Sequence, residues 1–256
     1  MGRSNQLRLG EVKQALRLVG ECRDLGADAR LWCQHAAASL HGLLGARMVF
    51  AALTPPGGFE RYQTATVVNA GLDRPEEQRL VLDYERSELQ LTDPLFWRVR
   101  AIVQAGVTVR RVRYATDREF HASPTYAAVL HPAGLDDLLY SERPSADGAA
   151  VLNFNLHRAA GDRRFTPRDA RLLALFHDEV ARLVGPVLAD GRDLRAGLPP
   201  RLRQTLDSLL DGDGEKQAAL RLGLSRHTVH TYTVALYRRF GVSSRAELLA
   251  RFVRRR

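Results

Sequence analysis

The most chemically suggestive stretch of this sequence is GLSRHTVHTYTVALYRRFG, residues 223–241. Apolar residues recur at helical spacing on one side of it: Val229, Leu236 and Phe240, with Tyr232 at the margin. The opposite side carries side chains that a buried core does not explain: His227, His230, Thr231, Val234 and Arg238. In the major groove of DNA, a valine or threonine methyl can contact thymine, histidine and threonine can hydrogen-bond base edges, and arginine can bind guanine or phosphate. The stretch therefore predicts a helix whose outer face is suited to DNA.

A glycine turn separates this stretch from a shorter helical segment, EKQAALRL at residues 215–222. Gly223 can adopt the left-handed conformation that ends a helix, and the Ser225 side chain can cap the next helix by accepting a backbone N–H. Two helices joined in this way form a helix-turn-helix. Residues 201–211 and 244–253 also have helical spacing, which predicts an all-α four-helix C-terminal domain. We expect the apolar side of the second helix to pack on four leucines: Leu206, Leu209, Leu210 and Leu220.

Basic charge is concentrated in this C-terminal region. Residues 198–256 hold 12 Lys or Arg against 5 Asp or Glu, whereas residues 1–197 hold 26 against 24. A basic unit attached to a nearly neutral one is expected where only one part of a protein binds a polyanion. The alternative is a small helical bundle whose basic face is only solvated.

The elements before this region indicate a different kind of domain. Helical spacing covers residues 9–18, 28–44, 74–89 and 166–184, and the last of these has Thr166 as a cap, Pro167 at the first position and Asp169 at the third. Strand patterns cover residues 46–53, 62–68, 107–114 and 149–159; in the last of them Val151, Asn153 and Asn155 face away from Leu152, Phe154 and Leu156. Because helices and strands do not alternate regularly, we expect an α+β domain with one antiparallel sheet flanked by helices.

A charged segment rich in turn formers, PVLADGRDLRAGLPP at residues 186–200, lies between the two regions. The sequence therefore predicts a domain at residues 1–185, a linker at 186–197 and a helix-turn-helix domain at 198–256.

Residues 198–253 resemble the LuxR-type (GerE-like) helix-turn-helix of bacterial transcription factors. The matching segments are LPPRLRQTLDSLLDG, KQAALRLGLSRHTV and ALYRRFGVSSRAELL. The resemblance implies that the third helix enters the major groove and that the fourth contributes to a dimer. By position it implies base-facing roles for His230, Thr231 and Val234, to which the outer-face pattern adds His227. The phosphate contacts implied by position are Lys216, Arg226, Thr228 and Arg239, to which the same pattern adds Arg238.

The match departs from the family at four positions. Leu202 replaces the glutamate of the usual LTPRE opening, His230 and Val234 stand where lysines are frequent, and Tyr232 stands where histidine is usual. These departures concern the operator sequence rather than the fold.

The N-terminal domain more loosely resembles a GAF- or PAS-like sensor, and it lacks the pattern of a phosphoacceptor receiver. The segment LDYERSELQLTDPLFWRV, residues 82–99, resembles the Tyr…Asp-Pro part of autoinducer-binding domains. An aromatic wall with a single carboxylate suits a mostly apolar ligand. The candidate pocket residues are therefore Tyr84, Asp93, Phe96 and Trp97; the alternative is that these aromatics are ordinary core.

No motif favours catalysis or a metal. Histidines 121, 131, 157 and 177 lack a second ligand at helical or finger spacing, and the sequence has no GxSxG elbow and no glycine-rich phosphate loop. Cys22 and Cys33 fit buried thiols, with a redox-sensing pair as the alternative. We therefore expect no catalytic residues, no metal and no cofactor.

These patterns together predict a cytoplasmic, sequence-specific DNA-binding regulator, since no apolar run suits a membrane span or a secretory signal. The expected partners are double-stranded DNA, a second copy of the chain, and a small molecule or protein as the signal; RNA polymerase is a further candidate partner. Two rivals are a protein-interaction module tethered to DNA by the basic helix-turn-helix, and a sensor enzyme.

Overall fold

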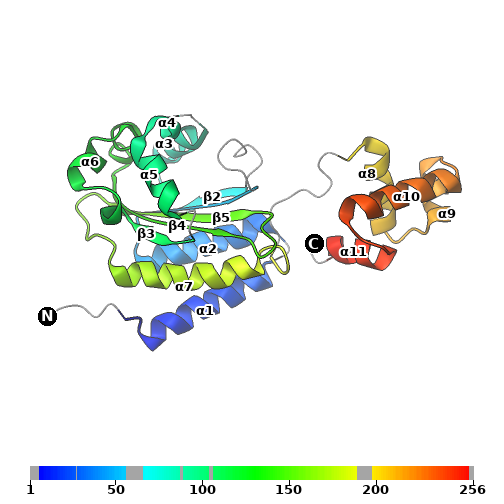
Figure 1. Cartoon of the computed structure of the whole chain (residues 1–256), viewed down its shortest axis with the longest axis horizontal. Coiled ribbons are helices and arrows are strands. Elements are labelled where there is room, and N and C mark those ends of the chain that lie inside the picture. Colours follow the sequence, from blue (N-terminus) through cyan, green and yellow to red (C-terminus); the bar gives the residue numbers. More distant parts are fainter. Residues whose placement is uncertain are drawn as a thin grey trace. The chain divides into compact units, whose positions relative to one another are not determined.

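The computed structural model describes residues 6–26, 28–55, 66–86, 89–103, 106–188 and 198–253 (Figure 1). The chain divides into two compact units, Met1–Gly191 and Arg192–Arg256. The domain and linker limits expected from the sequence stay a prediction, and most of the expected linker lies outside the described residues.

The N-terminal unit is built on one five-stranded antiparallel sheet, which confirms the predicted α+β class. The strand order is β2 (Thr66–Ala70), β1 (Met48–Thr54), β5 (Val151–Ala159), β4 (Leu135–Pro144) and β3 (Thr108–Arg110). The two faces of β5 differ as the sequence predicted, because Leu152, Phe154 and Leu156 belong to the core on one side of the sheet, whereas Asn155 and His157 line a pocket on the other.

Each face of the sheet is covered by its own helices (Figure 1). The larger core lies between the sheet and α1 (Leu9–Asp24), α2 (Ala29–Leu44) and α7 (Pro167–Leu183). A second core lies on the opposite face, beneath the segments between β2 and β4. These are α3 (Pro75–Arg86), α4 (Leu89–Thr92), α5 (Pro94–Val103), a 3-10 turn η2 (Arg111–Arg113), α6 (Asp117–His121) and a π-helical turn η3 (Tyr126–Leu130).

Local signals account for the two long helices α2 and α7. Asp28 Oδ1 accepts the backbone N–H groups that open α2, and Gly45 ends that helix with φ of 59°. Thr166 and Asp169 form a reciprocal capping box at the start of α7, with Pro167 at its first position. The sequence prediction for both helices is confirmed.

Several elements of the N-terminal unit differ from the sequence prediction, which did not include α5. Helix α1 continues to Asp24 rather than ending near Leu18. The strand expected over residues 107–114 is only Thr108–Arg110, and β4 was not predicted at all. The sequence of β4 lacks the hydrophobic alternation of a strand because several of its buried residues are charged, among them Asp137 and Glu142.

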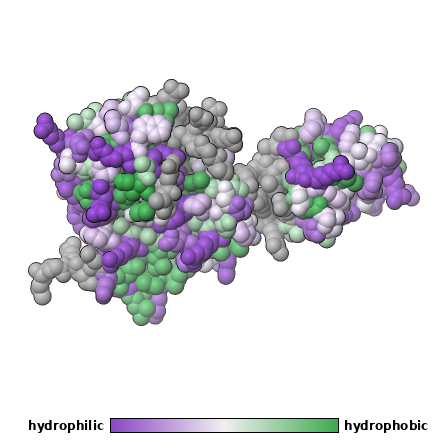
Figure 2. Space-filling view, in the orientation of Figure 1, coloured by the Kyte–Doolittle hydropathy of each residue, from purple (hydrophilic) through white to green (hydrophobic). Residues whose placement is uncertain are grey.

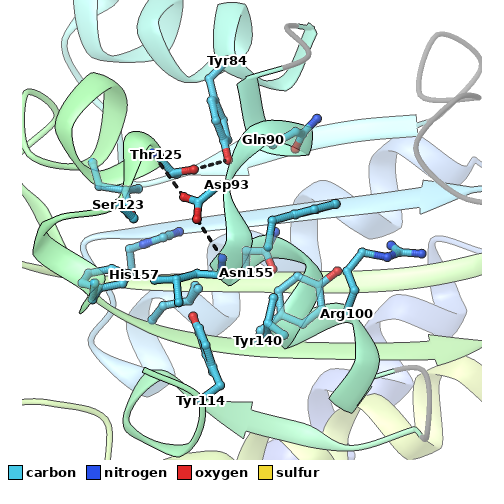
Figure 3. Close-up of a pocket in the computed structure, with 16 residues that line it drawn as sticks. Tyr84, Gln90, Asp93, Arg100, Tyr114, Ser123, Thr125, Tyr140, Asn155 and His157 are labelled. Carbon is cyan, nitrogen blue, oxygen red and sulfur yellow. Dashed lines mark hydrogen bonds between the residues drawn. The ribbon is translucent and has the colours of Figure 1, made fainter. Parts of the chain in front are cut away.

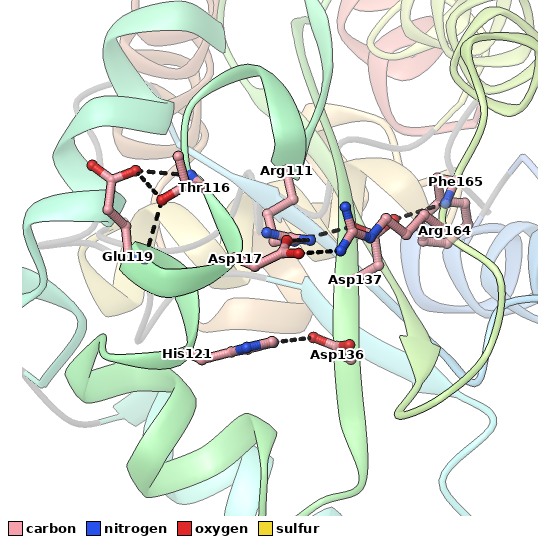
Figure 4. Close-up of polar contacts among 9 residues, drawn as sticks. All are labelled: Arg111, Thr116, Asp117, Glu119, His121, Asp136, Asp137, Arg164 and Phe165. Atoms are coloured by element: carbon pink, nitrogen blue, oxygen red, sulfur yellow. Dashed lines mark hydrogen bonds and ion pairs between the residues drawn. The ribbon is translucent and has the colours of Figure 1, made fainter.

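Arg111 is the first residue after β3, and its buried guanidinium pairs with Asp137 of β4 (Figure 4). The side chain is 1% exposed, with Nε 3.1 Å from Asp137 Oδ1 and Nη2 2.7 Å from Asp117 Oδ1. Asp137 Oδ2 also accepts the Phe165 N–H, and Arg164 pairs with Asp117. This network joins η2, α6, β4 and the segment before α7, and it depends on residues far apart in the sequence.

The Gly71→Ala variant is expected to be strongly destabilised. Gly71 has φ of +91°, and an added Cβ would lie 2.3 Å from the Arg47 carbonyl oxygen and 2.4 Å from the His41 ring. We expect a loss of about 2 kcal/mol or more in the free energy of unfolding, measured by denaturant titration. Gly161→Ala is the matched control, because Gly161 has φ of +82° but no atom within 4 Å of its Cβ position. Equal losses in the two variants would show that φ alone, and not the close approach, restricts residue 71.

The C-terminal unit consists of α8 (Pro200–Leu210), α9 (Glu215–Leu222), α10 (Arg226–Phe240) and α11 (Arg245–Val253), as the four-helix prediction required. Its core contains five buried residues from α8, α10 and α11: Leu206, Leu209, Leu236, Phe240 and Leu248. A smaller cluster joins Val229 to α9 through Ala218 and Ala219.

The expected contact of Leu220 with α10 was wrong, because this side chain is 77% exposed. Ala218 and Ala219 already occupy the buried side of α9, and Leu224, beyond the turn, packs against the same cluster. Leu220 therefore projects into solvent.

Candidate functional site

The turn between α9 and α10 sets the orientation of the outer helix face. Gly223 has φ of 63°, which ends α9, and the Ser225 hydroxyl accepts the Thr228 N–H at 3.0 Å, which caps α10. Gly241, with φ of 60°, ends α10. The predicted helix-turn-helix geometry is thus present, and it follows from short-range signals alone.

The outer face of α10 carries the residues predicted to face DNA bases. His227, His230 and Thr231 are exposed, and Val234 is half-buried. His230 Nδ1 lies 3.0 Å from Glu215 Oε1, and the Thr231 hydroxyl donates to the His227 carbonyl oxygen at 3.0 Å. The face therefore combines ordered polar groups with an accessible methyl-bearing residue.

The residues predicted to contact phosphates lie on α9 and at both ends of α10. Lys216 is exposed near the start of α9, and Arg226 is exposed at the first position of α10. Thr228 is half-buried, and its hydroxyl lies 2.8 Å from the Ser225 hydroxyl. Arg238 and Arg239 are exposed in the last turn of α10. Positive side chains thus flank the outer face of α10 at its two ends.

The N-terminal unit contains a pocket between its sheet and the helices α3–α6 (Figure 3). Three of the four residues predicted for a pocket line it: Tyr84, Asp93 and Phe96. Trp97 does not, because its ring is 56% exposed and its Nε1–H donates to the Leu91 carbonyl oxygen. On α5 the neighbouring residues Phe96 and Trp97 point in different directions, so a stretch of adjacent aromatics cannot all enter one pocket.

Asp93 is a buried anchor of this pocket. Its Oδ1 accepts the Leu95 N–H at 2.8 Å, and its Oδ2 accepts the Thr125 N–H at 3.2 Å. The Tyr84 hydroxyl lies 3.1 Å from the Thr125 hydroxyl. These contacts connect α3, the start of α5 and the segment before η3 around one carboxylate, as Figure 3 shows.

The sheet supplies pocket residues that the sequence reasoning did not select. Asn155 and His157 lie on β5. Among the residues that the structure describes, Asn155 Oδ1 and His157 Nδ1 find no hydrogen-bond partner. Burial lowers the pKa of His157 to about 4, so the ring is neutral at pH 7. The only sequence signal for their position in the pocket was the alternation of apolar and polar residues along β5. The other lining residues that were not predicted are Gln90, Leu95, Val99, Arg100, Tyr114, Phe120, Ser123, Thr125, Leu130, Leu138 and Tyr140.

The charged groups around the pocket are already partnered. Arg100 Nη1 lies 3.5 Å from Glu142 Oε2, which also accepts the Tyr140 hydroxyl at 2.9 Å. Asp93 accepts two backbone N–H groups, and His157 is neutral. The pocket therefore favours an uncharged occupant over an ion.

Cys22, Cys33 and His177 are buried in the N-terminal unit. Burial raises the pKa of Cys22 to about 12 and raises that of Cys33 as well, which opposes formation of the thiolate. His177 Nδ1 lies 2.7 Å from the Ser141 hydroxyl, but both side chains are fully buried and out of reach of a substrate. Among the described residues, no group of three His, Cys, Asp or Glu side chains is placed to hold a metal ion, and no helix is long and apolar enough to cross a membrane.

Several solved structures are similar to this chain. SdiA in complex with octanoyl-rac-glycerol is similar in structure, with a TM-score of 0.52 and 12% sequence identity over 97% of this chain and 97% of that chain. Two further structures have lower TM-scores. Escherichia coli SdiA in space group P6522 has 0.44, with 14% identity over 89% of this chain and 91% of that one. CepR2 from Burkholderia cenocepacia, an N-acylhomoserine lactone dependent LuxR family transcription factor, has 0.41, with 11% identity over 69% of this chain and 99% of that one.

At these identities the likeness to SdiA concerns the fold. A search of curated proteins found no match, and the GAF- or PAS-like character of the N-terminal unit stays a prediction. Residues 196–252 match the family model GerE, described as bacterial regulatory proteins of the luxR family. The helix-turn-helix of this chain, with its capped outer helix and basic ends, is therefore a DNA-binding domain of the LuxR (GerE) family.

Proposed function

We propose that this chain is a sequence-specific transcription regulator that binds the major groove of DNA as a dimer and is controlled by its N-terminal unit. The observation that carries the proposal is the outer face of α10, where His227, His230 and Thr231 are exposed beside Val234 on a capped helix. Histidine and threonine can hydrogen-bond base edges, and the methyl groups suit thymine. No packing role within the described C-terminal unit requires this combination.

Phosphate contacts would hold α10 in register. Lys216, Arg226, Arg238 and Arg239 are exposed around the ends of α9 and α10, and Thr228 lies in the first turn of α10. Each phosphate that a cationic side chain neutralises releases counterions, so affinity should fall steeply as salt rises.

One such unit reads too few base pairs for a useful specificity, and two copies on an inverted repeat would double the contacts. The N-terminal unit has an apolar surface that suits self-association, since Leu9 is 71% exposed and Leu16 is 50% exposed on α1. Figure 2 shows apolar side chains gathered over this helix. RNA polymerase remains a candidate partner of the DNA-bound dimer.

For the pocket we propose an uncharged amphiphile as the signal. The pocket has a volume of about 110 Å³, whereas one water needs only about 10–15 Å³. Its lining combines apolar side chains with partnered charges, and the structurally similar SdiA was solved with octanoyl-rac-glycerol, an uncharged amphiphile. Binding could alter the affinity for DNA only through a difference in ligand affinity between two arrangements of the chain.

The DNA-binding part is tested by selecting duplexes from a randomised pool with the full-length protein at moderate salt. We expect enrichment of an inverted repeat. Salt-sensitive retention of DNA without any enriched sequence would contradict sequence reading and leave the basic unit as an electrostatic tether for a protein-interaction domain.

The pocket is tested by thermal unfolding with 1-octanoyl-rac-glycerol. A ligand at about 100 times its dissociation constant adds about 2.7 kcal/mol, which for a chain of this size corresponds to a rise in Tm of roughly 5 °C or more. Phe96→Ala should abolish the rise because Phe96 lines the pocket, whereas Trp97→Phe should retain it because Trp97 lies outside. A rise that persists in Phe96→Ala would place the ligand elsewhere, and no rise in the wild type would exclude this amphiphile as the signal.

A further inference from the structure

The contact between His230 and Glu215 joins the two helices of the helix-turn-helix. Glu215 is the first residue of α9, and His230 lies on the outer face of α10. His230 Nδ1 is 3.0 Å from Glu215 Oε1, and the imidazole side chain is 61% exposed while the carboxylate is 28% exposed. The carboxylate is thus held at the edge of the face, and the ring remains available to a ligand.

This contact decides which ring nitrogen carries the proton. An ionised carboxylate can only accept a hydrogen bond, so the group that donates must be Nδ1–H. In a neutral imidazole with its proton on Nδ1, Nε2 is an acceptor. The ring therefore presents a lone pair, rather than an N–H, at its other nitrogen.

The hydroxyl of Thr231, the next residue of α10, is also limited to accepting hydrogen bonds from a further partner. Its hydroxyl donates to the His227 carbonyl oxygen at 3.0 Å within α10. The single hydroxyl proton is therefore occupied, and the oxygen has only lone pairs left for a further partner. Two adjacent side chains of α10 thus both present acceptors.

We propose that Glu215 is a positioning residue that sets the base preference of α10, by fixing His230 as a hydrogen-bond acceptor. Beside Thr231, His230 would then select bases that present a donor in the major groove. Only the exocyclic amino groups of adenine (N6) and cytosine (N4) do so, whereas guanine N7 and O6 and thymine O4 are acceptors. This inference rests on the proposed function, in which α10 lies in the major groove.

The tautomer is measured first, without DNA. Full-length protein labelled with ¹⁵N in histidine gives two-bond ¹H–¹⁵N correlations whose pattern identifies the protonated nitrogen of each neutral ring, and His230→Gln assigns the His230 signals. At pH 8 we expect the proton on Nδ1 in the wild type and a shift toward the Nε2–H form in Glu215→Gln. A wild-type ring that carries its proton on Nε2 would overturn the proposal.

The base preference is then measured by selection from a randomised duplex pool at pH 8, with wild type, Glu215→Gln, His230→Gln and Asp211→Asn in parallel. Asp211 is a matched control because it also forms a 3.0 Å ion pair in this unit, with Arg221. Because every base pair carries one such amino group, the selected duplex is also synthesised with that group deleted at the position that changes in His230→Gln, as purine for adenine or 2-pyrimidinone for cytosine. We expect the deletion to weaken wild-type binding by about tenfold and to have little effect on binding by Glu215→Gln. Asp211→Asn should select the wild-type sequence.

The outcomes separate this inference from the proposed function. A wild-type motif that Glu215→Gln selects unchanged, or wild-type binding that does not depend on the amino group at the His230-dependent position, would overturn the role of Glu215 while leaving sequence reading intact. If the wild type enriches no motif, the proposed function fails and the inference fails with it.

Discussion

Replacing His230 and Thr231 together by alanine is expected to weaken binding to the selected operator by roughly 30- to 1000-fold. The estimate follows from two lost base contacts worth about 1–2 kcal/mol each, the lower part of the range for base contacts because neither side chain is bidentate. Because both side chains are exposed, the substitutions remove little packing, and the variant should fold like the wild type. The measurement is a titration of full-length protein on operator and on unrelated duplex at fixed salt.

The control is a pair of variants at positions proposed to contact phosphates, Lys216→Ala and Arg226→Ala. These should weaken binding to operator and unrelated duplex by a similar factor and lower the salt slope by about one each, because phosphate contacts carry no sequence information. If the His230/Thr231 double variant behaved in this way too, its residues would be electrostatic contacts and would not read bases.

The N-terminal unit is expected to lose stability as the pH falls from 7 to 5. Burial lowers the pKa of His157 to about 4, below the ordinary value of 6.5, so the folded chain excludes a proton that the unfolded chain takes up. Above pH 6.5 the neutral ring of His157 costs no stability. As the pH falls from 6.5 toward the folded pKa of about 4, the free energy of unfolding decreases progressively. The full loss is about 3 kcal/mol, of which about 2 kcal/mol falls between pH 7 and 5. Buried His177, whose pKa is also lowered, acts in the same direction.

Denaturant titrations at pH 7, 6 and 5 measure this effect. The slope of the unfolding free energy against pH should be smaller in His157→Gln, because the substituted side chain does not titrate. His131→Gln is the control, since His131 is exposed. An unchanged slope in His157→Gln would mean that the ring takes up its proton in the fold, most simply because water enters the pocket.

Features encoded by short-range patterns were the ones that the sequence predicted well. The turn at Gly223, the cap at Ser225, and the capping box of Thr166 and Asp169 depend on residues three or fewer positions apart. The alternation along β5 likewise follows from the strand period of two. Helix-turn-helix geometry and much of the α+β fold could therefore be predicted without knowledge of any long-range contact.

Strand β4 and the pocket could not be predicted in this way. From the sequence, Asp137 is expected at the surface. In the structure it is buried because it pairs with Arg111, which lies 26 positions away in the chain. Asn155 and His157 line a pocket only because α5 and the segment after β3 cover that face of the sheet. Leu220 was expected in the core, but the packing of Ala218, Ala219 and Leu224 had already filled that side of α9.

The sequence by itself thus determined that this chain ends in a basic helix-turn-helix and begins with an antiparallel α+β unit, because periodicity, caps and local charge act over a few residues. Only the tertiary structure decided which side chains meet: Trp97 lies outside the pocket, Asn155 and His157 lie inside it, and Glu215 lies against His230. The physical reason is that each of these placements depends on neighbours from other elements of the chain. Those neighbours are known only once the fold has brought them together.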